Sequence, residues 1–247
     1  MLYVVSALVV LGLSGLMSMA GLGVAFLVVP LLYWMGVPLS EAASTGLLLN
    51  AISLSFATIT YWRAGLVNVA VGAPVGVAAI VGAPIGARLA PHVPKTMLLV
   101  LFAAFLVFAG AMMLFYRRAA GSRSIPRSAE LGMGAGVGGA AGVLGGLLGV
   151  GGGNLILPVL HLYGLEAKVA AGTTALAVVF SSLSGFLGRV SVGSLDVPLV
   201  VVCSVAAAIG SLVGSRVMAS RVSTIQLKQL IAVLLWVVAA SILIGLL

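Results

Sequence analysis

Long apolar stretches follow one another along almost the whole chain, and short interruptions between them carry most of the charged residues. Most stretches reach the roughly 20 residues that an α-helix needs to cross a bilayer. The second and seventh are shorter and are interrupted by glycine and proline. The first has no basic residues ahead of it and no polar domain after it, so we do not expect a removable signal peptide. The pattern predicts about ten segments, at residues 2–19, 21–37, 42–62, 66–90, 96–116, 129–148, 150–165, 169–188, 195–215 and 225–247.

The amino-acid composition indicates that these segments lie in a lipid bilayer. Of the 247 residues, 62% are hydrophobic and 6% are charged, and the mean hydropathy is +1.33. A soluble domain carries about 25% charged residues, so this chain could not cover a water-facing surface. We therefore expect an all-α integral membrane protein that crosses the cell inner (plasma) membrane several times. Its one cysteine, Cys203, lies in an apolar stretch and can form no intramolecular disulfide.

The net charge of +8 does not indicate a nucleic-acid partner, because the basic residues are spread over short loops with no aromatic residues between them. Their densest run is 117–127, with Arg117, Arg118, Arg123 and Arg127. A basic loop between membrane segments is typical of the cytoplasmic side. It divides the chain into a first membrane repeat (1–116), a basic cytoplasmic linker (117–128) and a second membrane repeat (129–247).

The two halves match when residue n is set against residue n + 128. Shared glycine is frequent at this composition, but shared proline, threonine and arginine in one ungapped register are not. The register pairs Gly21 with Gly149, Gly23 with Gly151, Pro30 with Pro158, Thr45 with Thr173, Asn68 with Asp196 and Arg88 with Arg216. Internal duplication is therefore the strongest signal in the sequence.

If each half has about five segments, each half crosses the membrane an odd number of times. The second half would then enter the membrane from the side opposite to the first. This predicts two inverted repeats, a common transporter architecture, with glycine- and proline-broken helices at their interface. Five crossings per half also place most of the remaining basic residues on the side of the 117–127 loop. Four crossings per half would move Arg216, Arg221 and Lys228 to the other side. We therefore expect both chain termini on the side opposite the loop.

Residues 149–158, GVGGGNLILP, look at first like a phosphate-binding loop. Such a loop needs a lysine directly after its glycines, and the next lysine here is Lys168. In a membrane, backbone that leaves a helix must be buried in protein or line a cavity. We interpret 149–153 as a break after which a new helix begins, whose first N–H groups attract an anion.

This interpretation makes Gly151, Gly152, Gly153 and Asn154 candidate substrate-binding residues, and Gly23 their counterpart in the first half. Glycines can instead allow two membrane helices to approach closely. We prefer that second interpretation for the glycine-rich stretch 132–146.

These elements resemble the sulfite exporter TauE/SafE family. The resemblance rests on the paired glycine and proline elements, the threonine-containing helix after each, and the basic central loop. It is clearest over 149–179, GVGGGNLILPVLHLYGLEAKVAAGTTALAVV, and the first half keeps fewer of the glycines. The resemblance implies a membrane transporter, acting as an exporter by alternating access, of small sulfur-containing anions such as sulfite or organosulfonates. We expect no cofactor and no metal. A homodimer stays an open option.

Polar residues inside the apolar segments are further candidates for the substrate site. Thr45, Thr173 and Thr174 lie close to the glycine elements, where a hydroxyl can donate to a substrate or bond back to the preceding helical turn. Asn50 needs partners in a membrane helix, and it belongs either to the site or to a link between helices.

Charged and titratable residues give weaker indications. Arg63 and Arg189 close two segments, and they either anchor them at the membrane surface or collect anions at the mouth of a pathway. For His161 a structural hydrogen bond is the preferred interpretation over a proton relay. The four acidic residues lie near segment ends, so the sequence assigns no coupling ion.

We do not expect an enzyme. The zinc-binding sequence His-Glu-x-x-His is absent, and a single aspartate cannot form the paired aspartates of an intramembrane protease. The competing function is an anion channel or another non-enzymatic pore, because broken helices also line channels.

Overall fold

The computed structural model describes residues 2–115, 127–189 and 197–245. These residues form ten α-helices and one short 3₁₀ turn, with no strand among them. The first half contains α1 (Leu2–Met19), α2 (Ala25–Trp34), α3 (Leu39–Arg63), α4 (Val69–Leu89), the turn η1 (Ala90–His92) and α5 (Lys95–Phe115). The second contains α6 (Arg127–Leu148), α7 (Gly153–Leu162), α8 (Ala167–Arg189), α9 (Val197–Arg221) and α10 (Thr224–Ile244).

The helix bounds follow the offset of 128 residues that relates the two halves of the sequence. Adding 128 to the bounds of α2 gives those of α7, and the first residues of α3 and α4 map onto those of α8 and α9. Each half therefore has the same order of helices, with a short second helix in the same place. Most of the 117–127 loop, together with Asp196, falls outside the described residues.

Five described helices are long and apolar enough to cross a membrane. Their spans are Ser40–Arg63, Val69–His92, Ala167–Arg189, Val197–Arg221 and Ile225–Ile244. Large apolar side chains are exposed on several of them, for example Val81 on α4 and Val205 on α9. Lipid requires such a surface, whereas water does not favour it. The protein is therefore a multi-pass membrane protein made of helices.

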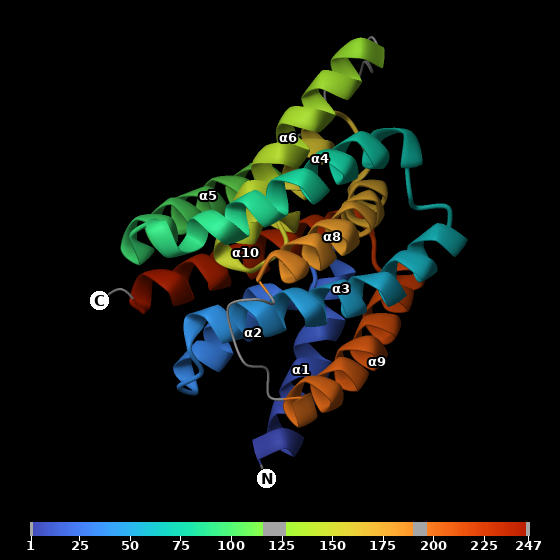
Figure 1. Ribbon diagram of the computed structural model, residues 1–247. Helices are drawn as coiled ribbons and strands as arrows, with labels where there is room; N and C mark the ends of the chain where they lie inside the picture. The colour runs from blue at the N-terminus through green and yellow to red at the C-terminus, as the bar shows by residue number, and fades with distance from the viewer. Residues whose placement is uncertain (1, 116–126, 190–196, 246–247) are drawn as a thin grey trace.

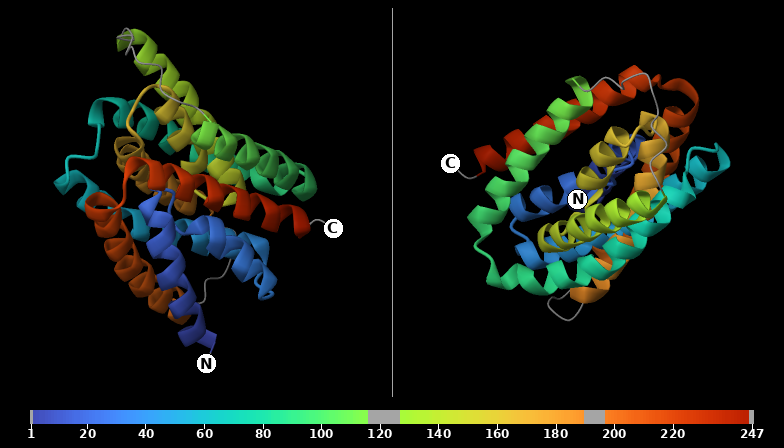
Figure 2. Two further views of the ribbon diagram at one scale, coloured as in Figure 1. Left: turned by 180° about the vertical axis from the view of Figure 1, so that it is seen from behind. Right: turned by 90° about the horizontal axis from the view of Figure 1, so that it is seen from above.

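The helices pack in a continuous series from α6 through α4, α8, α3 and α9 to α1, and α5 packs against α10 (Figure 1). Two further views show the same arrangement, with α6 and α4 at one end and α1 and α9 at the other (Figure 2). The order of helices in this series is symmetric: from either end it runs first, fourth and third helix. The first helix of each half packs on the fourth helix of the other half, and the two third helices meet in the middle.

Glycines make the closest of these contacts possible. A Cβ atom on Gly138, Gly142 or Gly146 of α6 would collide with the backbone of α4 at Val75, Ala79 or Ala83. The corresponding contact between α9 and α1 uses Gly210 and Gly214 in the same way. Small residues let membrane helices approach to backbone contact. The packing interpretation of the glycine-rich stretch 132–146 is thus confirmed.

Candidate functional site

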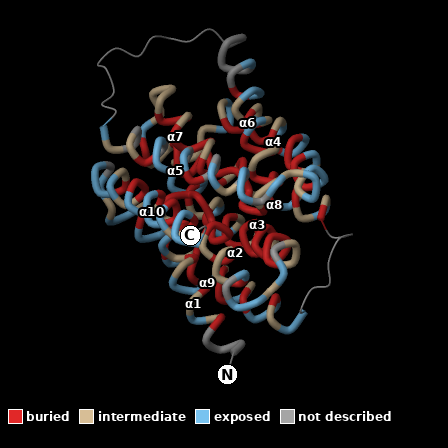
Figure 3. The backbone as a smooth tube through the Cα atoms, turned by 90° about the vertical axis from the view of Figure 1, so that its left-hand side faces the viewer, coloured by how far each residue is buried: buried red, intermediate tan, exposed pale blue. Residues whose placement is uncertain are grey.

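Two helix breaks lie in the interior of the protein. The chain leaves α1 after Met19 and begins α2 at Ala25, and it leaves α6 after Leu148 and begins α7 at Gly153. The residues of both breaks are buried (Figure 3). The helix break expected at 149–153 is confirmed. The glycines alone make it, because Pro158 lies inside α7 and does not end that helix.

Asn50, at the middle of α3, lies between the two breaks. A Cβ atom on Gly23 would collide with its side-chain oxygen, and one on Gly151 would lie 2.7 Å from its side-chain nitrogen. Both glycines have a positive φ, which other residues rarely adopt. Glycine is therefore required at both positions for the backbone angle and for the approach to Asn50.

The hydrogen bonds of Asn50 close the first break. Its Oδ1 accepts from the N–H of Ala25, the first residue of α2, at 3.1 Å. Its Nδ2 donates to the hydroxyl of Ser182 on α8 at 2.9 Å. Asn50 is fully buried and links three helices. Of the two interpretations of this residue, the structure supplies the contacts of an interhelical link, and a direct role with substrate stays a prediction.

The second break is not closed in this way. The residue before α7, Gly152, has a left-handed φ of 76° and gives no side-chain cap. The N–H of Leu155 bonds back to the Gly152 carbonyl at 3.1 Å. The N–H groups of Gly153 and Asn154 precede that bond and have no acceptor within the helix. The positive end of the α7 dipole thus lies in the protein interior without a cap.

Two buried polar side chains lie on α7 and on α8, which packs against it. Asn154 is 2% exposed, and among the described residues neither atom of its carboxamide has a hydrogen-bond partner. The Thr174 hydroxyl on the neighbouring helix α8 is also fully buried and has no partner among them. Buried polar groups without partners are rare and costly. An anion can accept from the Asn154 Nδ2 and from the Thr174 hydroxyl, whereas the Asn154 Oδ1 needs a donor.

Thr173 on α8 contacts the start of α4. Its Oγ1 accepts from the N–H of Asn68 at 2.9 Å, which fixes the start of α4 against α8. This contact differs from a bond to the preceding turn, and because the hydroxyl proton is not used in it, a donor role of Thr173 toward substrate stays a prediction. Thr45 occupies the equivalent position in the first half and is buried. Its role at the substrate site stays a prediction.

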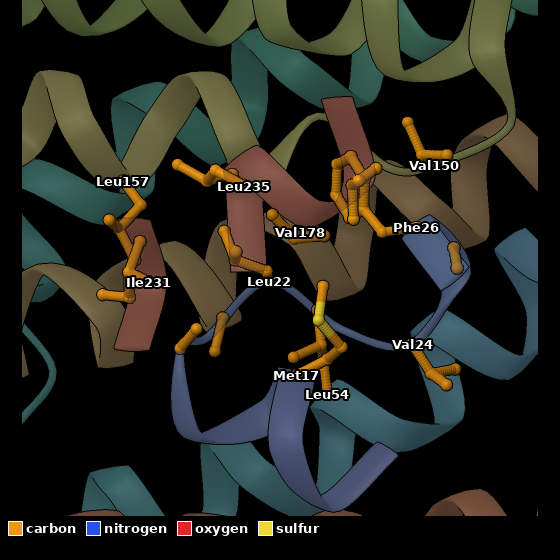
Figure 4. Packing of buried hydrophobic residues seen from close by; sticks show 14 of the residues in the cluster. Met17, Leu22, Val24, Phe26, Leu54, Val150, Leu157, Val178, Ile231 and Leu235 are labelled. Atoms are coloured by element: carbon orange, nitrogen blue, oxygen red, sulfur yellow. The ribbon is translucent and has the colours of Figure 1, made fainter. Parts of the chain in front are cut away.

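The first break has none of the unsatisfied polar groups of the second. The register partners of Asn154 and Thr174 are Phe26 and Gly46. Leu22 and Phe26 of the first half and Val150 and Val178 of the second belong to one buried hydrophobic cluster (Figure 4). The two halves thus share a backbone arrangement and differ in its chemistry.

Arg189, at the end of α8, is buried against the end of α6. Its Nη2 donates to the carbonyls of Gly146 and Leu147 at 2.7 and 2.8 Å, and its Nε donates to Gly146 at 3.3 Å. The register partner of Arg189 is Tyr61, whose hydroxyl donates to the carbonyl of Ser18 in the same place at the end of α1. Arg63 is exposed at the end of α3. A role of either arginine at a pathway mouth stays a prediction.

His161 bonds through Nδ1 to the Leu165 carbonyl at 2.8 Å, which confirms the structural hydrogen bond preferred for it. Within the described residues, no cluster of histidine, cysteine, aspartate and glutamate could hold a metal ion. Sequence reasoning missed Ser182 and Tyr61 as partners of the breaks. Tyr61 could have been found from the register, because it stands where the other half has Arg189.

Sequence comparison relates this chain to known membrane transporters. The family described as Sulfite exporter TauE/SafE matches residues 6–242. The "Probable membrane transporter protein YdhB" of Bacillus subtilis (strain 168) is 27% identical over 205 residues, which cover 78% of this chain and 81% of that protein. "Sulfite exporter TauE/SafE family protein 1" of Arabidopsis thaliana is 40% identical over 84 residues, 32% of this chain and 18% of that protein.

A second Arabidopsis thaliana protein, "Sulfite exporter TauE/SafE family protein 2", is 39% identical over 82 residues, 31% of this chain and 18% of that protein. The plant alignments thus span under a fifth of each plant relative. The family match, in contrast, covers nearly the whole chain. The chain belongs to the TauE/SafE family of membrane transporters.

Proposed function

We propose that this member of the TauE/SafE family exports a small sulfur-containing anion, such as sulfite or an organosulfonate, across the cell inner membrane. The anionic group binds at the start of α7, on the backbone N–H groups of Gly153 and Asn154. The Asn154 carboxamide and the Thr174 hydroxyl add side-chain donors. Family membership supports transport, and the name of the family supports the substrate class.

The observation that carries this proposal is an uncapped helix start at α7 together with two buried side chains, Asn154 on α7 and Thr174 on the adjoining α8, that have no hydrogen-bond partner among the described residues. A helix start attracts an anion through its free N–H groups and its dipole, with no need for a lysine. Sulfonate and sulfite oxygens accept several hydrogen bonds at once, which matches a cluster of donors. A cationic group would not be attracted to the same donors.

Alternating access follows from the relation between the halves. We infer that the second half is the inverted copy of the first, so that α2 and α7 reach the centre from opposite sides of the membrane. The reciprocal packing of first on fourth helices supports a two-fold relation between the halves. Movement of one half against the other would then open the anion site to each side in turn.

The test measures anion binding to the purified protein in detergent by calorimetry. The probes are sulfite, methanesulfonate and thiosulfate, with acetate as a further anion and glycerol as a neutral control. Asn154→Leu and Thr174→Val remove the donors and keep the approximate volume. We expect each to weaken binding by about 1–3 kcal/mol, the cost of leaving a buried partner unpaired.

Thr58→Val is the matched control. The Thr58 hydroxyl on α3 is also buried without a partner among the described residues, and it lies away from α7. We expect this variant to bind as the unchanged protein does. Equal affinity in all four proteins would refute the site at α7. Ohmic single-channel currents in a planar bilayer, without saturable counter-substrate exchange, would instead identify a channel.

Gly152 is a poor position for the same test. A Cβ atom there would collide with the carbonyl of Ala141, and the backbone has a left-handed φ. A substitution would therefore strain the fold, and a loss of binding would not distinguish the backbone site from a packing defect.

A further inference from the structure

The negative end of one helix dipole lies beside the anion site. The N–H groups of Val150 and Gly151 both turn back to the carbonyl of Gly145, at 2.9 and 3.4 Å. A Cβ atom on Gly145 would lie 2.6 Å from the Gly151 carbonyl carbon, so the last turn of α6 packs directly on the break. The last carbonyls of a helix carry partial negative charge. Left alone, they would oppose an anion at α7.

Arg189 neutralises this end of α6. Its guanidinium donates to the Gly146 and Leu147 carbonyls, in the turn that contacts the break. The side chain is 7% exposed, and no described carboxylate pairs with it. Among the described residues no counter-charge screens this buried cation, so its positive field extends to its neighbours.

In the first half, a neutral side chain binds the carbonyl at the equivalent helix end. Tyr61 stands in the register position of Arg189, and its hydroxyl donates to Ser18, the register partner of Gly146. The start of α2 is then satisfied by the neutral carboxamide of Asn50. Capping the end of the preceding helix therefore needs only a hydroxyl. The charge of Arg189 is surplus to that need, and it occurs in the half whose break is open.

We propose that Arg189 is a positioning residue for the anion. It acts through α6, whose negative end it neutralises, and its charge selects for the number of negative charges on the substrate. This inference rests on the proposed function, and it adds a determinant of charge selectivity that does not touch the substrate. The Arg189–α6 contact is thus part of the site, although the α7 donors make the bonds.

The test compares Arg189→Tyr, which copies the first half and keeps a capping hydroxyl, with Arg189→Lys, which keeps the charge. Binding of methanesulfonate, a monoanion, and of sulfite in alkaline buffer, a dianion, is measured by calorimetry. Because the Coulomb energy scales with ligand charge, we expect Arg189→Tyr to weaken the monoanion about threefold and the dianion about tenfold. Arg189→Lys should keep the preference for the dianion.

Tyr61→Phe is the matched control, because it removes the equivalent cap without changing charge, and it should alter both affinities equally or not at all. If Arg189→Tyr is recovered unfolded, Arg189→Gln carries the same comparison. Wild-type affinity for both anions in the Tyr or Gln variant, or loss of the dianion preference in Arg189→Lys, would overturn the inference. The α7 site would survive that result if Asn154→Leu still weakened binding. Absence of anion binding to the unchanged protein would instead refute the proposed function, and this inference with it.

Discussion

Replacement of Val178 by asparagine should close the second break as Asn50 closes the first. Val178 is the register partner of Asn50, and Gly153 is the register partner of Ala25, whose N–H Asn50 binds. A methyl group of Val178 lies 3.2 Å from the position of a Cβ atom on Gly153. A carboxamide at residue 178 would therefore meet the start of α7.

The size of the effect follows from the groups involved. A side-chain cap at a helix start stabilises by about 0.5–2 kcal/mol. Burying a new amide costs a similar amount unless it is hydrogen-bonded, so the net change in the free energy of unfolding should stay within about 1 kcal/mol. The anion would lose a charge-assisted bond worth about 1.5–3 kcal/mol. Its affinity should fall about 10- to 100-fold.

Calorimetry with sulfite and thermal unfolding in the same detergent measure both quantities. Val178→Ala is the control, because it removes the methyl groups and adds no acceptor, and it should keep the affinity of the unchanged protein. The reasoning is refuted if Val178→Asn folds and binds sulfite as tightly as Val178→Ala does. The N–H groups at the start of α7 would then not be the ligands of the anion.

Three other predictions test the Asn50 hydrogen bond, the packing of α6 on α4 and the membrane topology. Asn50→Val should lower the free energy of unfolding by about 1–3 kcal/mol in chemical denaturation, because the buried N–H of Ala25 loses its acceptor; unchanged stability would show that this bond is unimportant. Gly142→Ala should cost about 1–3 kcal/mol, because its Cβ would lie 2.5 Å from the Ala79 carbonyl oxygen. Gly136→Ala, with nothing within 4 Å, should instead be neutral or stabilise by up to about 1 kcal/mol, and equal effects would contradict the packing described for α6. A reporter fused to the C-terminus should be active only on the side opposite the basic loop, and cytoplasmic activity would exclude the inverted topology.

Much of the fold could be predicted from the sequence, because the properties that define a membrane helix are local. The length of an apolar stretch sets the length of a span. The glycines of 149–153 mark a helix break, whereas those of 132–146 lie within the continuous helix α6. The offset of 128 residues also relates the short segments expected at 21–37 and 150–165, within which α2 and α7 lie. The packing partners could not be predicted in this way. That α1 lies on α9 and not on α4 of its own half depends on contacts between distant residues.

The site could be predicted in part. The glycine break and Asn154 follow from the requirement that a helix start in a membrane be satisfied by something. Thr173 and Thr174 are adjacent in sequence and equally buried, yet one bonds to Asn68 and the other has no partner among the described residues. The direction of a side chain on a helix and the position of its neighbours decide that difference. The sequence contains neither.

Alternating access requires contacts between the halves that can exchange. Asn50 binds α2 in its own half and Ser182 in the other, so the second bond is the one that a relative movement would break. Other bonds between the halves are of the same kind: Ser14 donates to the Ala207 carbonyl, and Ser184 donates to that of Ile80. Hydrogen bonds between membrane helices average about 0.6 kcal/mol, within reach of the binding energy of a small anion. The bond from Asn50 to α2 lies within one half and would move with it. In the proposed cycle, the first break would therefore stay closed while the second exchanges its anion.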